Sequence, residues 1–118
     1  MGHGTEHVAN ELYPEMDKLF EHFGYSNMHM GTIEGNFSIE SFLDELKNFH
    51  PDHIHLAPFM IVAGDHATND MSGEDDDSWK SILEKEGYSV KCTLKGLGEI
   101  QAIRDIFIRH TRAGLDRL

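Results

Sequence analysis

Residues 53–79, HIHLAPFMIVAGDHATNDMSGEDDDSW, decide the fold that we expect for this chain. The stretch begins with a largely apolar run over residues 54–62 that His55 and Pro58 interrupt. A continuous apolar run is typical of a strand that is buried on both faces of a parallel sheet. The run ends in the small-residue turn Ala63-Gly64, after which the chain reaches His66. Ligands of open α/β sheets bind just beyond the carboxyl ends of such strands, so His66 occupies a position where binding sites are usually built.

Charge and cysteine content exclude several classes of protein. Asp and Glu number 21 against 10 Lys and Arg, which gives a formal net charge of −11 with His neutral. Such a surface repels phosphate backbones, so we expect no nucleic-acid partner. The single cysteine, Cys92, excludes an internal disulfide and a thiolate metal cluster. We interpret Cys92 as a core or strand residue rather than a nucleophile.

Membrane and export signals are also missing from the sequence. No stretch approaches the roughly 20 apolar residues that a bilayer-spanning helix needs. The opening residues, MGHGTE, lack the basic start and the apolar middle of a signal peptide. We therefore expect a soluble cytoplasmic protein with no membrane partner.

Helix-type and strand-type segments alternate along the chain. Apolar residues recur at three-and-four spacing over residues 6–23, where Pro14 predicts a kink or a later start and Gly24 predicts the end. The same reasoning predicts the remaining segments. They are a strand over 27–34, a helix from Ser38 to Pro51-Asp52, the central strand over 53–62, a helix over 79–85 closed by Gly87, a strand over 88–94, a turn over 96–98, and a helix over 100–118 with Ile103, Ile106, Phe107 and His110 inward.

The predicted order lacks a first strand. In a βαβα chain that strand commonly lies in the middle of the sheet, so its loss leaves unpaired strand edges. We expect either a fragment of a longer protein or a strand supplied by another chain. A direct pairing of the two flanking strands would refute this hypothesis. The fold class that we predict is α/β, one domain over residues 1–118, with a small parallel sheet flanked by helices on both faces and its first strand missing.

The acidic run over residues 74–77 has two interpretations. It can be a solvated loop that places negative charge at the start of the next helix, or a lip that collects cations. We favour the solvated loop, because adjacent carboxylates without the spacing of a calcium loop make poor chelates.

Three metal-binding side chains stand at equivalent places in the predicted sheet. His3 follows the presumed first strand, Glu34 ends the second, and His66 follows the third. The spacing of His66 alone would favour a helix cap or a buried structural role, but all three side chains belong to the same sheet edge. Two imidazoles and a carboxylate form an open ligand set for Co²⁺, Ni²⁺, Fe²⁺ or Zn²⁺. The nine histidines of the chain are scattered, so we expect most of the others to be surface or helix-end residues.

Several motifs resemble the anaerobic cobalt chelatases, which insert Co²⁺ into sirohydrochlorin. The resemblance spans the whole chain and is most specific around His66. It implies a class II, ATP-independent tetrapyrrole chelatase with the ferrochelatase-like fold, of which this chain resembles the C-terminal lobe. The motifs are GHGTEH over 2–7 with Ala9-Asn10, GTIE over 31–34, PFMIVAGDHATNDM over 58–71 with DSWK over 77–80, and GLGE over 96–99 with Ala102-Ile103-Arg104.

The resemblance also implies roles for individual residues. His3 is similar to the metal ligand that accepts a pyrrole proton, Glu34 to the carboxylate ligand, and His66 to the second imidazole, which makes His3 and His66 the catalytic pair. It further implies Co²⁺ as the metal substrate, with Ni²⁺ or Fe²⁺ as alternatives, and a homodimer or a companion N-terminal lobe as partner. No nucleotide-binding loop is present, which agrees with a reaction that needs no ATP. The macrocycle is expected to contact Glu34 and a wall formed by Met60, Ile61, Val62, Ala63, Gly64 and Asp65.

Other functions remain open at the level of sequence. The same three ligands could serve a non-catalytic metal-binding or carrier protein, or an isolated lobe that is inactive by itself. A metal-free oligomerisation half-domain with structural histidines is a third interpretation. Stoichiometric metal binding without turnover would favour the first of these, and a melting temperature insensitive to metal would favour the third.

Overall fold

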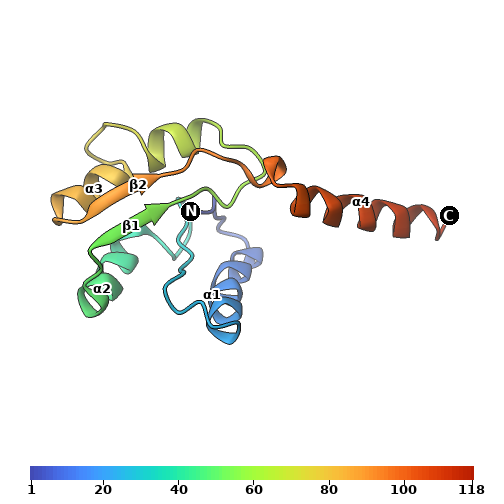
Figure 1. Ribbon diagram of the computed structural model, residues 1–118, viewed down its shortest axis with the longest axis horizontal. Helices are drawn as coiled ribbons and strands as arrows, with labels where there is room; N and C mark the ends of the chain where they lie inside the picture. Colours follow the sequence, from blue (N-terminus) through green and yellow to red (C-terminus); the bar gives the residue numbers. More distant parts are fainter.

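Two short strands pair in parallel near the centre of the molecule. β1 (His53–Leu56) lies beside β2 (Ser89–Cys92), with His53 opposite Ser89 and Leu56 opposite Cys92. The helix α3 (Trp79–Lys85) connects the two strands and packs against β2 (Figure 1). The computed structural model describes all residues from 1 to 118 and confirms the predicted α/β class with a small parallel sheet.

The other elements are helical. Pro14 lies in the first turn of α1, where its missing N–H costs no helical hydrogen bond, so the predicted later start is confirmed. Gly24, with φ 84°, follows directly and ends the helix in the left-handed conformation that glycine tolerates. The helical elements are η1 (Val8–Glu11), α1 (Leu12–His22), α2 (Ile39–Phe49), the π-helix η2 (His66–Met71), η3 (Leu97–Glu99) and α4 (Gln101–Leu115).

The hydrophobic core forms around alternate residues of β1. Ile54 and Leu56 are buried, whereas His53 and His55 are exposed. The predicted continuous burial of this strand is therefore wrong, because α1 and α4 contribute no buried residue to cover a second face. Ile54 and Leu56 pack with the first residue of the chain and with side chains of α2, η2 and α3. These residues are Met1, Ile39, Leu46, Ala67, Met71, Trp79 and Leu83.

The strands are shorter than the sequence predicts. The central strand ends at Leu56 rather than Val62, and the last strand covers Ser89–Cys92 rather than 88–94. The predicted strand over 27–34 is reduced to an isolated parallel bridge between Thr32 and Gly2. A strand requires a neighbour for its N–H and C=O groups, and residues 27–30 have none alongside.

Met1 and Gly2 lie between the segment that follows β1 and residues 31–33, outside the two-stranded sheet. The Met1 amino group donates to the Ala57 carbonyl at 2.6 Å, and the Phe59 N–H donates to the Met1 carbonyl at 2.6 Å. On the other side the Gly2 N–H donates to the Gly31 carbonyl at 2.8 Å. The two flanking segments do not pair with each other directly, because Met1 and Gly2 lie between them. The missing first strand stays a prediction.

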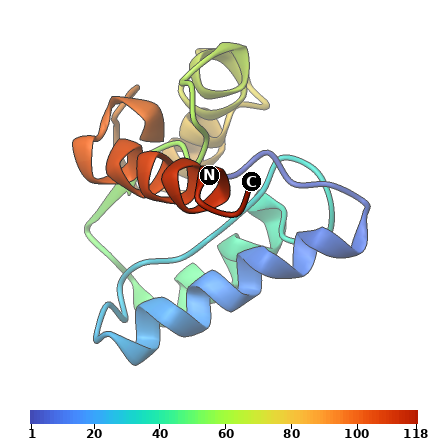
Figure 2. The same ribbon diagram turned by 90° about the vertical axis from the view of Figure 1, so that its right-hand side faces the viewer.

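α4 projects away from the rest of the molecule (Figures 1 and 2). The prediction that Ile103, Ile106, Phe107 and His110 point into the core is wrong, since Ile106 is 37% and Phe107 is 56% exposed. The physical reason is that α4 packs appreciably only against η3, at its own amino end. Neither α4 nor any other helix is long and apolar enough to cross a membrane.

The acidic loop and Cys92 have the structural roles expected of them. Residues 74–77 are exposed, and Lys80 and Lys85 pair with Glu74 at 2.6 Å and Asp76 at 2.9 Å. These contacts support the interpretation of a solvated loop. Cys92 ends β2 and is half-buried, and burial raises the pKa of its thiol, which keeps the sulfur protonated and unreactive.

The buried Met1 amine predicts a pH dependence of stability in the 118-residue chain. Burial lowers the pKa of this group from 8.0 to about 6. Between pH 6 and 8 the unfolded chain binds more protons than the folded one, so the free energy of unfolding should rise with pH across this window. The full effect should be roughly 2–3 kcal/mol.

Urea unfolding at pH 5.5 and 8.5 would measure this effect, with the N-acetylated chain as control because it has no amine to titrate. The acetylated chain keeps the titration of all nine histidines. Equal pH dependence in both proteins would contradict the assignment to Met1.

Candidate metal centre

His66 opens the π-helix η2 and is oriented by a carboxylate on the same helix. Its Nδ1 lies 2.6 Å from Oδ2 of Asp70, four residues further on. An ionised carboxylate only accepts hydrogen bonds, so Nδ1 of His66 carries the proton. The lone pair of the neutral ring is then on Nε2. Both side chains are 47% exposed, so this nitrogen is not sealed within the core.

His3 has the same tautomer for a different reason. Its Nδ1 lies 2.9 Å from the carbonyl oxygen of Gly4, which can only accept. Nε2 of His3 therefore also holds the lone pair when the ring is neutral. The rings of His3 and His66 meet edge to face, with centroids 4.6 Å apart and an interplanar angle of 83°. The structure thus brings together two imidazoles that each have Nε2 available for a metal or a proton.

The loop that carries His3 is held by two residues near the start of the first helical region. The Thr5 N–H donates to Oδ1 of the buried Asn10 at 2.9 Å, and the Gly4 N–H donates to the Tyr13 hydroxyl at 3.2 Å. Gly4 has φ 82°, and a Cβ there would lie 2.0 Å from the Glu34 carbonyl oxygen. Only glycine fits this position, because the backbones of Gly4 and Glu34 are in direct contact.

Glu34 is close to His3 through its backbone. Its N–H donates to the His3 carbonyl at 2.8 Å, and its carbonyl accepts from the Thr32 hydroxyl at 2.7 Å. The side chain is exposed, and no three ligand side chains converge on one point in this structure. His3 and His66 are therefore in contact, while the role of the Glu34 carboxylate stays a prediction.

The predicted macrocycle wall is held from behind by the glycine turn at residues 96–98. The Leu97 N–H donates to the Met60 carbonyl at 2.8 Å, and the Gly98 N–H donates to the Ile61 carbonyl at 3.0 Å. The Ile61 and Val62 side chains are 50% and 71% exposed. The backbone of the wall is thus fixed while its apolar side chains remain available for contact.

The remaining wall positions are also accessible. Met60 and Ala63 are half-buried beside the core, and Gly64 and Asp65 are exposed. Nothing lies within 4 Å of a Cβ placed at Gly64. Asp65 precedes His66 at the start of η2.

Other histidines contact residues outside the pair formed by His3 and His66. Nδ1 of His7 accepts from the Ala9 N–H and caps η1, and Nε2 of His55 lies 2.6 Å from the Thr93 hydroxyl. The His29 ring packs against Phe42 and Phe49. His22 ends α1 and His50 caps α2, and both are exposed. The expectation that most of these histidines are surface or helix-end residues is confirmed.

Sequence reasoning missed the residues that orient the site. Asp70 could have been found from its i,i+4 spacing to His66, which places two side chains on one helical face. Asn10, Tyr13 and Gly96 gave no local signal, because each acts on a residue that only the tertiary fold brings near.

Comparison with known proteins identifies the family of the chain. The family model described as cobalt chelatase (CbiK) matches residues 1–116. The chain belongs to this cobalt chelatase family. The resemblance drawn from the sequence motifs is therefore confirmed.

Two relatives of the family illustrate the match and its extent. The chain is 36% identical over 116 residues to the sirohydrochlorin cobaltochelatase of Salmonella typhimurium, covering 98% of this chain and 44% of that protein. It is 36% identical over 118 residues to sirohydrochlorin cobaltochelatase CbiKC of Nitratidesulfovibrio vulgaris, covering 100% of this chain and 42% of that protein. The chain thus spans less than half the length of these curated relatives.

The support behind the wall predicts a difference between two glycines. A Cβ at Gly96 would lie 2.4 Å from the Ile61 carbonyl oxygen, whereas Gly64 has open space around it. Gly96→Ala should lower the free energy of unfolding by about 1–3 kcal/mol, because backbone must shift. Gly64→Ala should change it by less than about 1 kcal/mol. Urea titrations of both variants would check this, and equal losses would contradict it.

The His66–Asp70 contact predicts an effect on metal affinity. Asp70→Asn keeps an oxygen that can accept from Nδ1 but removes the negative charge beside the imidazole. Binding of Co²⁺ should weaken by about 10–100-fold. Isothermal titration calorimetry would measure this, with Asp75→Asn in the exposed acidic loop as a charge-matched control. Equal affinities of the two variants would remove Asp70 from the site.

Proposed function

We propose that this chain is the metal-holding lobe of an ATP-independent sirohydrochlorin cobaltochelatase, in which His3, Glu34 and His66 present Co²⁺ to the macrocycle. The observation that carries the proposal is the contact between the His3 and His66 rings, each with its Nδ1 engaged by an acceptor. Membership of the cobalt chelatase family supports the class of reaction.

The chemistry requires a base beside exchangeable metal ligands. Inserting a divalent metal into a tetrapyrrole displaces two pyrrole N–H protons. Neutral imidazole can bind a first-row metal and can also accept a proton near neutral pH. We assign metal retention to His3, His66 and Glu34. As the metal passes to the macrocycle, the freed Nε2 of His3 would accept one pyrrole proton and that of His66 the other. The Glu34 carboxylate would offset the charge of the metal before the macrocycle becomes a dianion.

The macrocycle would lie against residues 60–65. This wall follows β1 and leads directly into His66, so a flat ring stacked on Ile61 and Val62 would meet the two imidazoles at its rim. Their exposed apolar side chains are suited to such a surface. The wall forms one side of a cleft only, and we propose that a companion N-terminal lobe or a second copy of the chain supplies the other.

The proposed setting follows from the same chemistry. The reaction needs no nucleotide and suits a reducing cytoplasm, where Co²⁺ and the reduced macrocycle both persist. Ni²⁺ and Fe²⁺ are alternative metal substrates, since imidazole and carboxylate ligands accept all three ions.

A second candidate function is a metal-binding or carrier lobe without catalysis. The observation that favours it is that the two imidazoles meet while no three ligand side chains converge, so the structure has a metal-binding pair without a complete ligand set. Such a lobe would hold Co²⁺ at the same imidazole pair and would not accelerate insertion.

Substitution of either imidazole should abolish chelation and leave the fold intact, because His3 lies in a loop and the exposed His66 is the first residue of η2. Anaerobic incubation with sirohydrochlorin and Co²⁺ would follow the absorption change of the macrocycle for the wild type, His3→Ala and His66→Ala. We expect the wild type to exceed the spontaneous rate and each variant to match it, whereas Asp75→Asn should retain wild-type turnover. Turnover in either alanine variant would end the assignment.

The same assay separates the two candidates. If the wild type binds Co²⁺ but does not exceed the spontaneous rate, the assay is repeated after the companion lobe is restored. Acceleration that then depends on His66 supports the chelatase, and its absence supports the carrier.

A further inference from the structure

Ser72 follows η2 at the point where the helical hydrogen bonding changes. Its N–H donates to the Ala67 carbonyl, five residues back, at 3.1 Å. The next N–H, that of Gly73, donates to the Asn69 carbonyl, four residues back, at 3.1 Å. The Thr68 carbonyl lies between these two acceptors and receives neither N–H. The end of the π-helix thus leaves one carbonyl outside the backbone ladder.

The Ser72 hydroxyl bonds to this carbonyl. Its oxygen lies 3.0 Å from the Ala67 carbonyl oxygen and 3.2 Å from that of Thr68. Carbonyl oxygens only accept, so the hydroxyl donates its one proton and shares it between them. A Cβ on Gly73 would lie 2.4 Å from the Asn69 carbonyl oxygen, so only glycine fits the return to four-residue bonding. Ser72 and Gly73 together hold the end of η2 in one bonding pattern.

The inner face of η2 is fixed, so the bonding pattern decides how the outer face is arranged. Ala67 and Met71 are fully buried in the core. His66 and Asp70 lie on the outer side, where both are 47% exposed. A π-helix has more residues per turn and a smaller rise per residue than an α-helix, which brings residues i and i+4 closer along the axis. The short side chain of Asp70 thereby comes within 2.6 Å of Nδ1 of His66.

We propose that Ser72 is a positioning residue for the metal centre, because its hydroxyl keeps η2 in the π-helical pattern that aligns Asp70 with His66. Without this donor the Thr68 carbonyl is satisfied best by the N–H of residue 72, four residues ahead, which is the α-helical pattern. That change turns Asp70 about the helix axis relative to His66 and weakens their contact. The Nδ1–H tautomer of His66 therefore depends on a hydroxyl six residues away. The metal role of His66 rests on the proposed function, whereas its tautomer does not.

The tautomer of His66 tests this inference directly. ¹⁵N NMR of the metal-free chain, labelled at histidine, distinguishes Nδ1–H from Nε2–H rings at pH 8.5, well above the ordinary pKa of imidazole. The His66 signals are identified by their loss in His66→Ala. We expect the Nδ1–H tautomer in the wild type and in Ser72→Thr, which keeps the hydroxyl. Ser72→Ala should show a mixture of the two tautomers.

Metal affinity is the second readout. Binding of Co²⁺, followed by isothermal titration calorimetry, should weaken about tenfold in Ser72→Ala and stay within about twofold of the wild type in Ser72→Thr. The matched control is Ser81→Ala, which also removes a half-buried hydroxyl and its hydrogen bond, here with Ser78 at the start of α3. This control should lower the melting temperature and leave both the tautomer and the affinity unchanged.

An unchanged Nδ1–H tautomer in Ser72→Ala would overturn the inference, and so would equal effects of Ser72→Ala and Ser81→Ala. If the wild type binds no Co²⁺, the proposed function fails, while the metal-free tautomers still decide the role of Ser72. If Ser72→Ala does not fold, Ser72→Cys replaces it, because a thiol has a similar shape and is only a weak donor. The same mixture of tautomers is then expected, and a pure Nδ1–H ring would overturn the inference.

Discussion

The placement of Met1–His3 between two other segments is the constraint on which the site depends. Met1 is bonded to Ala57 and Phe59, and Gly2 is bonded to Gly31. These bonds connect parts of the chain that have no direct pairing with each other. They also bring His3 to the sheet edge where His66 begins η2, which is how two distant imidazoles come within 4.6 Å.

Position and orientation of the two imidazoles have separate origins. The long-range ladder brings the rings together, while a neighbouring carbonyl and a carboxylate one helical turn away set their tautomers. Local partners of this kind are robust, because they come from within four residues of the ring that they orient. The contact between the two rings therefore depends on the long-range hydrogen bonds, whereas their tautomers depend on the Gly4 carbonyl and the Asp70 carboxylate.

The sequence predicted the identity of the elements better than their extent. Helix starts and ends followed from Pro14, Gly24 and Gly87, because helix termination is a local effect. Strand ends did not, because they depend on distant neighbours. Residues 27–30 have no strand alongside, and residues 57–61 bond to Met1 and to the turn at residues 96–98 instead of extending β1. The inward face of α4 was wrong for a related reason, because its amphipathic pattern cannot say whether a partner surface lies in the same chain.

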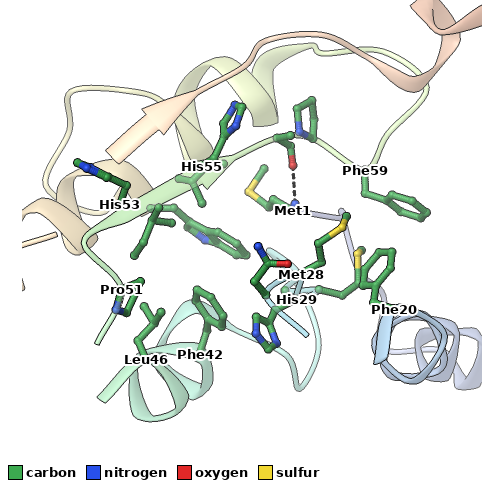
Figure 3. Close-up of a pocket in the computed structure, with 18 of the residues that line it drawn as sticks. Met1, Phe20, Met28, His29, Phe42, Leu46, Pro51, His53, His55 and Phe59 are labelled. Carbon is green, nitrogen blue, oxygen red and sulfur yellow. Dashed lines mark hydrogen bonds between the residues drawn. The ribbon is translucent and has the colours of Figure 1, made fainter. Parts of the chain in front are cut away.

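The exposed apolar surfaces of the chain differ in what they can accept. The wall at Ile61 and Val62 has its backbone bonded to the turn at residues 96–98, so it offers side chains and suits a flat apolar face. The backbone of α4 is bonded within the helix, so α4 can only pack through side chains such as Phe107. The groove lined by residues 27–31 and 53–58 (Figure 3) differs from both, because the N–H groups of His29 and Gly31 beside it donate to no other group of the chain. Contact area does not distinguish these three surfaces, whereas the hydrogen bonding of the backbone does.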